Sequence, residues 1–155
     1  MSFKRRNDLM RIYLDMNIYN RPFDDQAQVR IRLETIAIFS ILQKIKNKEL
    51  KLLWSFMLEY ENSLNPYADV RQEIEMAASL AFKDIAQDET ILSAAKKFEA
   101  KGIKPRDSIH LACALKGKAE YFLTCDDKLI RKASALDLNI KIISPLRFIE
   151  NMEVN

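Results

Sequence analysis

Short apolar segments alternate along this chain with longer segments in which apolar residues recur at helical spacing. The short segments are residues 11–14, 50–54, 121–124 and 140–143, and apolar residues run through them almost without a break. Segments of this kind are typical of strands that are covered on both faces. Strands separated by helices need crossover connections, which favour a mostly parallel sheet between two layers of helices. The sequence therefore predicts one three-layer α/β/α domain with a mostly parallel sheet of about four or five strands.

Helical patterns with recognisable ends lie between these strands. Ser55 is a candidate N-cap for a short helix that Pro66 ends, and Pro105 begins a helix that Gly117 ends. Residues 20–26 are expected to form a polar loop. The remaining helical patterns cover residues 31–48, 70–81, 92–98, 129–136 and 146–149.

At 155 residues the chain has the length of one domain. We expect residues 1–9 to form a loose, polar and basic tail and residues 10–152 to form the domain. No apolar run approaches the roughly 20 residues of a membrane span, and the first residues lack the apolar core of a signal peptide. Cys113 and Cys125 lie in apolar settings, so we expect a buried, reduced pair, which favours a cytoplasmic protein without a membrane partner.

The scarcity of glycine and histidine excludes several kinds of chemistry. The chain has two glycines, Gly102 and Gly117, so it has no glycine-rich loop for a dinucleotide or a nucleoside triphosphate. Its one histidine, His110, and the lack of a Cys-x-x-Cys motif exclude structural zinc sites and multi-histidine sites. A net charge of +3 neither indicates nor excludes a nucleic-acid partner. Any chemistry here must therefore depend on carboxylates.

Carboxylates follow the predicted strands or begin the next helix at four places. Asp15 and Asp126 follow strands, Asp107 begins a helix, and either Glu59 or Glu61 lies just after the second strand. Because the carboxyl ends of parallel strands share one edge of a sheet, we expect these acids to meet in one crevice. Acids gathered in this way raise each other's pKa unless a cation lies between them, and a hard divalent ion is the usual cation.

The aspartates also have ordinary structural explanations. Asp15 can satisfy the N–H groups of a turn, and Asp107 can complement the dipole of its helix. Either Asp126 or Asp127 can cap the next helix while the other faces the crevice. Asn17 either orients a water or Asp15, or forms part of the turn. The observation that favours a functional site over these ordinary roles is the shared position of the residues at one edge of the sheet.

Two further assignments stay open at this point. Glu59 and Glu61 differ by about 200° around a helix, so only one of them can face the crevice. His110 lies three residues after Asp107 and near it on one helix face. It is either a satisfied, partly buried histidine or a participant in the site.

Four segments of the chain resemble the PIN domain family, and the resemblance runs over residues 10–152. They are Ile12-Tyr-Leu-Asp15-Met-Asn17, Ser55-Phe-Met-Leu-Glu59-Tyr-Glu61, Asp107-Ser-Ile-His-Leu-Ala-Cys-Ala and Leu123-Thr-Cys-Asp126-Asp-Lys-Leu. No single segment is diagnostic, but all four occur in order at the family's spacing. Both Glu61 and Glu59 match the second acid in some members, and we favour Glu61. Thr124 places Asp126 in register with the fourth acid, which leaves Asp127 as a secondary candidate.

The resemblance implies a metal-dependent nuclease, usually an endoribonuclease. Small members of the family are often VapC-type toxins of bacterial type II toxin–antitoxin pairs, and they commonly form homodimers. We therefore expect Asp15, Asp107 and Asp126 to hold one or two Mg²⁺ or Mn²⁺ ions, with Glu61 completing an acidic ring. Candidate RNA-binding cations around this ring are Arg21, Lys104, Arg106, Lys128, Arg131 and Lys132.

Other interpretations of the same residues stay open. Tyr19 and Phe23 either stack on an unpaired base or belong to the core. A phosphatase like the haloacid dehalogenases would use Asp15 as a nucleophile, but residue 17 is Asn where such enzymes usually have Asp. The chain is alternatively a catalytically inactive PIN-like module that binds RNA or protein, or a stand-alone RNA-processing nuclease without an antitoxin.

Overall fold

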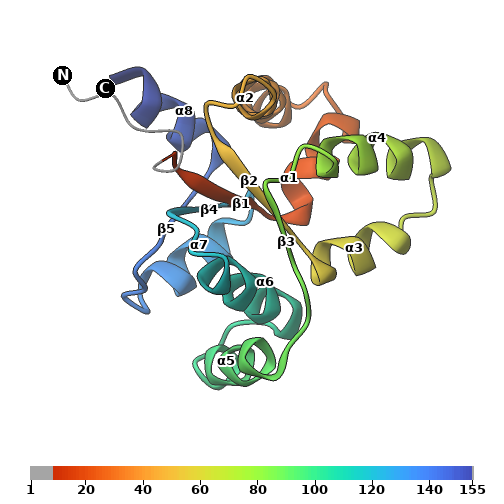
Figure 1. Cartoon of the computed structure of the whole chain (residues 1–155). Helices are drawn as coiled ribbons and strands as arrows, with labels where there is room; N and C mark the ends of the chain where they lie inside the picture. Colours follow the sequence, from red (N-terminus) through yellow and green to blue (C-terminus); the bar gives the residue numbers. More distant parts are fainter. Residues whose placement is uncertain (1–8, 155) are drawn as a thin grey trace.

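The computed structural model describes residues 9–154 of the chain (Figure 1). The expected tail at residues 1–9 therefore lies outside the described residues except for Leu9. Cys113 and Cys125 are buried and unpaired, as expected. No helix in the described part of the chain is long and apolar enough to cross a membrane.

A five-stranded sheet forms the centre of the molecule, with the strand order β3-β2-β1-β4-β5 and every neighbouring pair parallel. Its strands are β1 (Arg11–Leu14), β2 (Lys51–Ser55), β3 (Lys83–Ile85), β4 (Tyr121–Leu123) and β5 (Lys141–Ile143). The predicted parallel α/β/α domain is confirmed. β1 is the central strand, and its residues 12–14 are fully buried. Asp15, which directly follows β1, therefore emerges at the middle of the sheet's carboxyl edge.

The sequence patterns do not predict β3. Lys83 and Asp84 are exposed, and Ile85 is its one buried residue, so no apolar run marks the strand. β3 is an edge strand that pairs only with β2. Charged side chains on such an edge discourage pairing with another chain.

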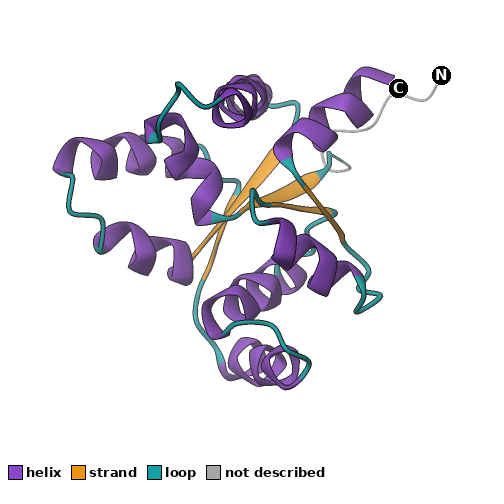
Figure 2. Cartoon of the chain, turned by 180° about the vertical axis from the view of Figure 1, so that it is seen from behind, coloured by secondary structure: helices purple, strands orange, loops and turns teal. Residues whose placement is uncertain are grey.

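Helices cover both faces of the sheet (Figures 1 and 2). On one face α2 (Val29–Lys46) packs against α8 (Pro145–Val154). On the other face lies α6 (Pro105–Lys116), against which α5 (Glu89–Ala100) packs as an outer helix, and α7 (Asp127–Ser134) contacts β5. This arrangement places the beginnings of α6 and α7 at the same edge of the sheet as Asp15.

Shorter helices follow β1 and β2 at the carboxyl edge (Figure 1). They are α1 (Met16–Asn20), the 3₁₀ helix η2 (Arg21–Phe23), α3 (Phe56–Ser63) and α4 (Ala68–Ala78). The expected polar loop at residues 20–26 is wrong in its first part, because Asp15 caps α1 and Pro22 lies in the first turn of η2. The expected N-cap is confirmed, since Ser55 Oγ accepts the Leu58 N–H at 3.2 Å.

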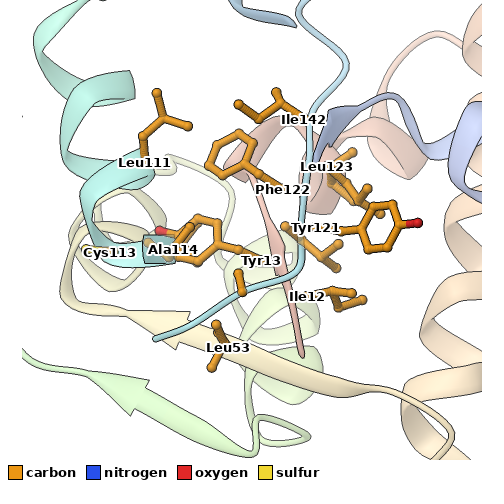
Figure 3. Packing of buried hydrophobic residues seen from close by; sticks show 14 of the residues in the cluster. Ile12, Tyr13, Leu53, Leu111, Cys113, Ala114, Tyr121, Phe122, Leu123 and Ile142 are labelled. Atoms are coloured by element: carbon orange, nitrogen blue, oxygen red, sulfur yellow. The ribbon is translucent and has the colours of Figure 1, made fainter. Parts of the chain in front are cut away.

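The core around β1 fixes α6 against the sheet (Figure 3). Tyr13 stacks on Phe122 of β4 with ring centroids 5.4 Å apart, and its side chain points from β1 toward α6. Gly117, which ends α6, lies so close to β2 that a Cβ there would be 2.7 Å from Leu53 Cδ1. Close packing of this kind holds Asp107 and His110 of α6 in a constant position relative to β1.

Candidate active site

Asp15 is held rigidly at the carboxyl end of the central strand. It is 5% exposed and caps α1 by accepting the Met16 N–H at Oδ1 over 2.8 Å. Its Oδ2 accepts the Thr124 hydroxyl at 2.8 Å and Asn17 Nδ2 at 3.2 Å. Burial raises the pKa of Asp15, while the nearby His110 and these hydrogen bonds act in the opposite direction. The carboxylate is therefore both costly to ionise and fixed in position.

Thr124 joins the segments that leave β1 and β4. Its hydroxyl donates to Asp15, and its Oγ1 accepts Asn17 Nδ2 at 3.0 Å and the Asp126 N–H at 3.1 Å. Asn17 Oδ1 in turn accepts the Cys125 N–H at 3.0 Å. Asn17 thus contacts Asp15 directly and holds the loop that carries Asp126.

Asp126 and Asp127 point to different surroundings. Asp126 Oδ1 caps α7 by accepting the N–H groups of residues 128 and 129 at 3.0 and 3.2 Å. Asp127 pairs instead with Arg30 of α2, with oxygen–nitrogen distances of 2.8 and 2.9 Å, and this pairing lowers its pKa. The charge of Asp126 also acts on Asp107, whereas Asp127 is paired with Arg30.

Asp107 has the clearest electrostatic signature of the site. It lies in the first turn of α6 and is partly buried. Its own burial, and then the charges of Asp15 and Asp126, raise its pKa to about 6, while His110 and Lys104 act in the opposite direction. Acids from three separate segments therefore sit close enough to repel one another.

The open choice between Glu59 and Glu61 has a geometric answer. Glu59 Oε2 accepts the Trp54 indole N–H at 3.0 Å, on an exposed side of α3. Glu61 Oε1 forms a hydrogen bond with His110 Nε2, and the Glu61 charge acts on Asp15. Glu61 is therefore the glutamate that the fold brings to the aspartates.

His110 connects the acids to the core. It is 1% exposed, and its Nδ1 lies 2.6 Å from the Tyr13 hydroxyl. Its Nε2 lies 3.9 Å from Asp15 Oδ1, in addition to its hydrogen bond with Glu61. Burial alone would lower the pKa of His110, but the Glu61 hydrogen bond and the surrounding carboxylates together raise it. The contact with Tyr13 was not predicted, although a tyrosine hydroxyl buried in a central strand must find a partner.

The candidate RNA-binding cations divide into two groups. Arg21 is turned toward the protein, with Nη1 3.2 Å from Asp24 Oδ2 and Nε 3.4 Å from Glu34 Oε1. Arg106 lies 3.8 Å from Glu61 Oε2. The remaining candidates are exposed. Lys104 precedes α6, Lys128 lies near the beginning of α7, and Arg131 and Lys132 lie in the last turn of α7.

A cavity of about 670 Å³ opens beside Glu61 and Arg106. Its lining includes Phe23, which is 49% exposed, and Tyr67, which is 67% exposed. Tyr19, in contrast, is buried and packs edge-on against a core tryptophan, so its expected alternative role in base stacking is wrong. The aromatic surface next to the acids is therefore formed by residues other than Tyr19.

The donor set of the crevice suits a hard divalent cation. Carboxylate oxygens are the ligands that Mg²⁺ and Mn²⁺ prefer, and burial together with the charges of Asp15 and Asp126 raises the pKa of Asp107. Among residues 9–154, no group of three acidic, histidine or cysteine side chains is arranged to hold a metal ion directly. Mg²⁺ typically keeps several waters and uses one or two carboxylates, so this donor set fits an ion bound partly through water.

Comparison with known proteins agrees with this fold. No curated protein matches the chain. A chain from the crystal structure of VapBC2 from Rickettsia felis bound to a DNA fragment from their promoter matches with a TM-score of 0.59 and 16% identity. The match covers 87% of this chain and 98% of that chain, and it shows a shared fold. A family model, the PIN domain, matches residues 12–135, which include Asp15, Glu61, Asp107 and Asp126. This chain belongs to the PIN domain family.

Proposed function

We propose that this protein is a divalent-metal-dependent endoribonuclease. The observation that carries the proposal is the gathering of acids from separate segments at the carboxyl edge of β1. His110 Nε2 lies 3.9 Å from Asp15 Oδ1 and bonds to Glu61, and the charges of Asp15 and Asp126 act on Asp107. Acids that repel one another in this way favour a bound cation, and oxygen ligands suit Mg²⁺ or Mn²⁺. Membership of the PIN domain family supports the proposal, because PIN domains are generally nucleases.

In this proposal Asp15, Asp107 and Asp126 hold one or two ions, with Glu61 beside them. The bound ion supplies Lewis acidity and neutralises charge on the phosphate oxygens. Thr124 and the Met16 N–H hold the Asp15 carboxylate in place while the substrate binds. Glu61 gives one oxygen to His110, and its other oxygen, Oε2, which lies 3.8 Å from Arg106, would orient the attacking water. No protein nucleophile is needed.

RNA would reach this acidic crevice through the cations around it. Exposed cations near the beginnings of α6 and α7, and one in the last turn of α7, can contact phosphates. They are Lys104, Arg106 and Lys128 near the beginnings and Arg131 in the last turn. Arg21 contributes less in this proposal, because Asp24 and Glu34 already neutralise it. Phosphate contacts of this kind make binding fall steeply as the salt concentration rises.

We further propose that the protein is the toxin of a type II toxin–antitoxin pair, held inactive by a partner protein and dimeric in the cytoplasm. The similarity in fold to a chain of the VapBC2 complex supports this assignment. A stand-alone RNA-processing nuclease is the second candidate, and a small antitoxin gene next to this one would favour the toxin. A catalytically inactive module is disfavoured, because carboxylates occupy all four positions of the site.

Cleavage of total RNA in Mg²⁺ or Mn²⁺ tests the proposal. The wild-type protein should cut RNA, and a chelator should stop the reaction. Asp15→Asn and Asp107→Asn should each slow cleavage by roughly 100-fold or more, the scale expected when charge stabilisation is lost. Asp127→Asn is the matched control and should cut at the wild-type rate, because Asp127 pairs with Arg30 outside the crevice.

Circular dichroism of each variant separates loss of chemistry from loss of fold. Folded Asp15→Asn and Asp107→Asn proteins with full activity would end the catalytic assignment. RNA that binds the wild-type protein but is never cut in any divalent metal would favour the inactive module.

A further inference from the structure

A continuous chain of hydrogen bonds runs through the core and ends at Glu61. Ser55 Oγ accepts the Leu58 N–H at 3.2 Å and lies 2.7 Å from the Tyr13 hydroxyl. The Tyr13 hydroxyl lies 2.6 Å from His110 Nδ1, and His110 Nε2 bonds to Glu61 Oε1. Ser55 and Tyr13 are fully buried, and His110 is nearly so. The chain thus joins α3, β1 and α6 without a water.

The donors and acceptors in this chain leave one arrangement at its outer end. If the imidazole is neutral, its ring proton lies on Nε2, because the Glu61 carboxylate can only accept, and Nδ1 then accepts from the Tyr13 hydroxyl. If the imidazole is charged, Nδ1 donates to Tyr13, which donates to Ser55, and Nε2 still carries a proton. In both states the Nε2–H donates to Glu61. The Tyr13 hydroxyl therefore pairs with Nδ1 in both states and supports the form of His110 that attracts the carboxylate.

Glu61 needs such a constraint to stay with the aspartates. Its side chain is flexible, it lies on the eight-residue helix α3, and the Asp15 charge repels it. The exposed Arg106 lies 3.8 Å from Glu61 Oε2 and competes for the same carboxylate. The Nε2–H of His110 opposes both effects, and the Ser55 end of the chain caps the helix that carries Glu61.

We propose that Ser55, Tyr13 and His110 form a positioning relay that holds the Glu61 carboxylate in the active site. The relay rests on the proposed nuclease function, and its members act through Glu61 without touching the substrate. This role differs from ordinary core packing, because it depends on one hydroxyl group rather than on the volume of the tyrosine ring.

Tyr13→Phe removes that hydroxyl and keeps the ring that stacks on Phe122. We expect kcat for RNA cleavage to fall about 10- to 100-fold at unchanged KM, as for other partners that orient an active-site ligand. Tyr19→Phe is the matched control. Tyr19 is also buried, but its hydroxyl has no hydrogen-bond partner in the described chain, so its loss should leave kcat unchanged.

A double-mutant cycle separates positioning from general damage. In a Glu61→Ala background, Tyr13→Phe should change kcat by no more than about twofold, because the group that it positions is already gone. A loss as large as in the wild-type background would overturn the relay, as would full activity in Tyr13→Phe alone.

An NMR measurement on tag-free protein tests the relay without relying on activity. The chain has one histidine, so a slowly exchanging imidazole N–H resonance belongs to His110. The resonance should be present in the wild type and in Tyr19→Phe, and it should be lost to fast exchange in Tyr13→Phe and Glu61→Ala. Its persistence in Tyr13→Phe would refute the relay. A wild-type protein that shows the resonance but cuts no RNA would instead refute the nuclease function alone.

Discussion

Asp107→Asn should stabilise the metal-free protein at neutral pH and not at pH 4. The pKa of Asp107 is raised from 3.8 to about 6, so the folded protein holds its proton over a pH range in which the unfolded chain has lost it. Stability from this group is therefore fully present below pH 3.8 and is lost as the pH rises through about 6. Asn cannot ionise and avoids that loss.

The size of the expected stabilisation by Asp107→Asn follows from the same pKa. A difference of roughly two pKa units corresponds to about 3 kcal/mol, which is an upper bound. Asp107 is partly exposed, so solvent screening reduces this value to on the order of 1–2 kcal/mol. Losing a carboxylate from the first turn of α6 costs about 0.3–1 kcal/mol, because the charge complements the helix dipole. We therefore expect a net stabilisation of roughly 1 kcal/mol above pH 7.

Urea unfolding in EDTA measures this difference directly. The single tryptophan, Trp54, is 3% exposed and reports unfolding by fluorescence. The gain of Asp107→Asn over the wild type should grow from near zero at pH 4 to its full value above pH 7. A variant that is less stable than the wild type at pH 7.5, or a gain that is independent of pH, would refute the argument that burial and the neighbouring charges disfavour the ionised form of Asp107.

Three further substitutions test the packing and the ion pairs. Gly117→Ala should lower the free energy of unfolding in urea by about 1–3 kcal/mol, because its Cβ would lie 2.7 Å from the buried Leu53 Cδ1. An unchanged unfolding midpoint would show that β2 can move away from α6 without a cost in stability. Tyr19→Phe should raise the free energy of unfolding by about 1 kcal/mol, because it removes a buried hydroxyl that has no partner among the described residues. A loss of stability would show that this hydroxyl is hydrogen-bonded in the folded protein. Asp127→Asn should cost less than about 1 kcal/mol in thermal unfolding, because its pair with Arg30 is exposed, and a larger loss would mean that the pair orders α7.

The sequence predicts those parts of the fold that depend on neighbouring residues. β1 and β2 follow from continuous apolar runs, and Ser55 caps α3 because a serine directly precedes that helix. β3 could not be found in this way, since Lys83 and Asp84 are exposed and its pairing with β2 supplies the structure that its own residues do not indicate.

In the candidate site, too, only the features that depend on neighbouring residues could be predicted from the sequence. The convergence of Asp15, Asp107 and Asp126 follows from their places after strands and at the beginning of a helix. The choice between adjacent acids does not, because it depends on distant partners: Arg30 holds Asp127 from 97 residues away. His110 was ambiguous for the same reason, since Tyr13, the partner of its Nδ1, also lies 97 residues away.

The most direct test of the account is Mn²⁺ binding measured by isothermal titration calorimetry. Wild-type protein and the matched control Asp127→Asn should bind Mn²⁺ with the same affinity, because Asp127 belongs to the Arg30 pair. Asp15→Asn should weaken binding by roughly 10-fold or more, since it removes one of the charges that gather the ion. Equal Mn²⁺ affinity for wild type and a folded Asp15→Asn protein would contradict the claim that these acids share one ion.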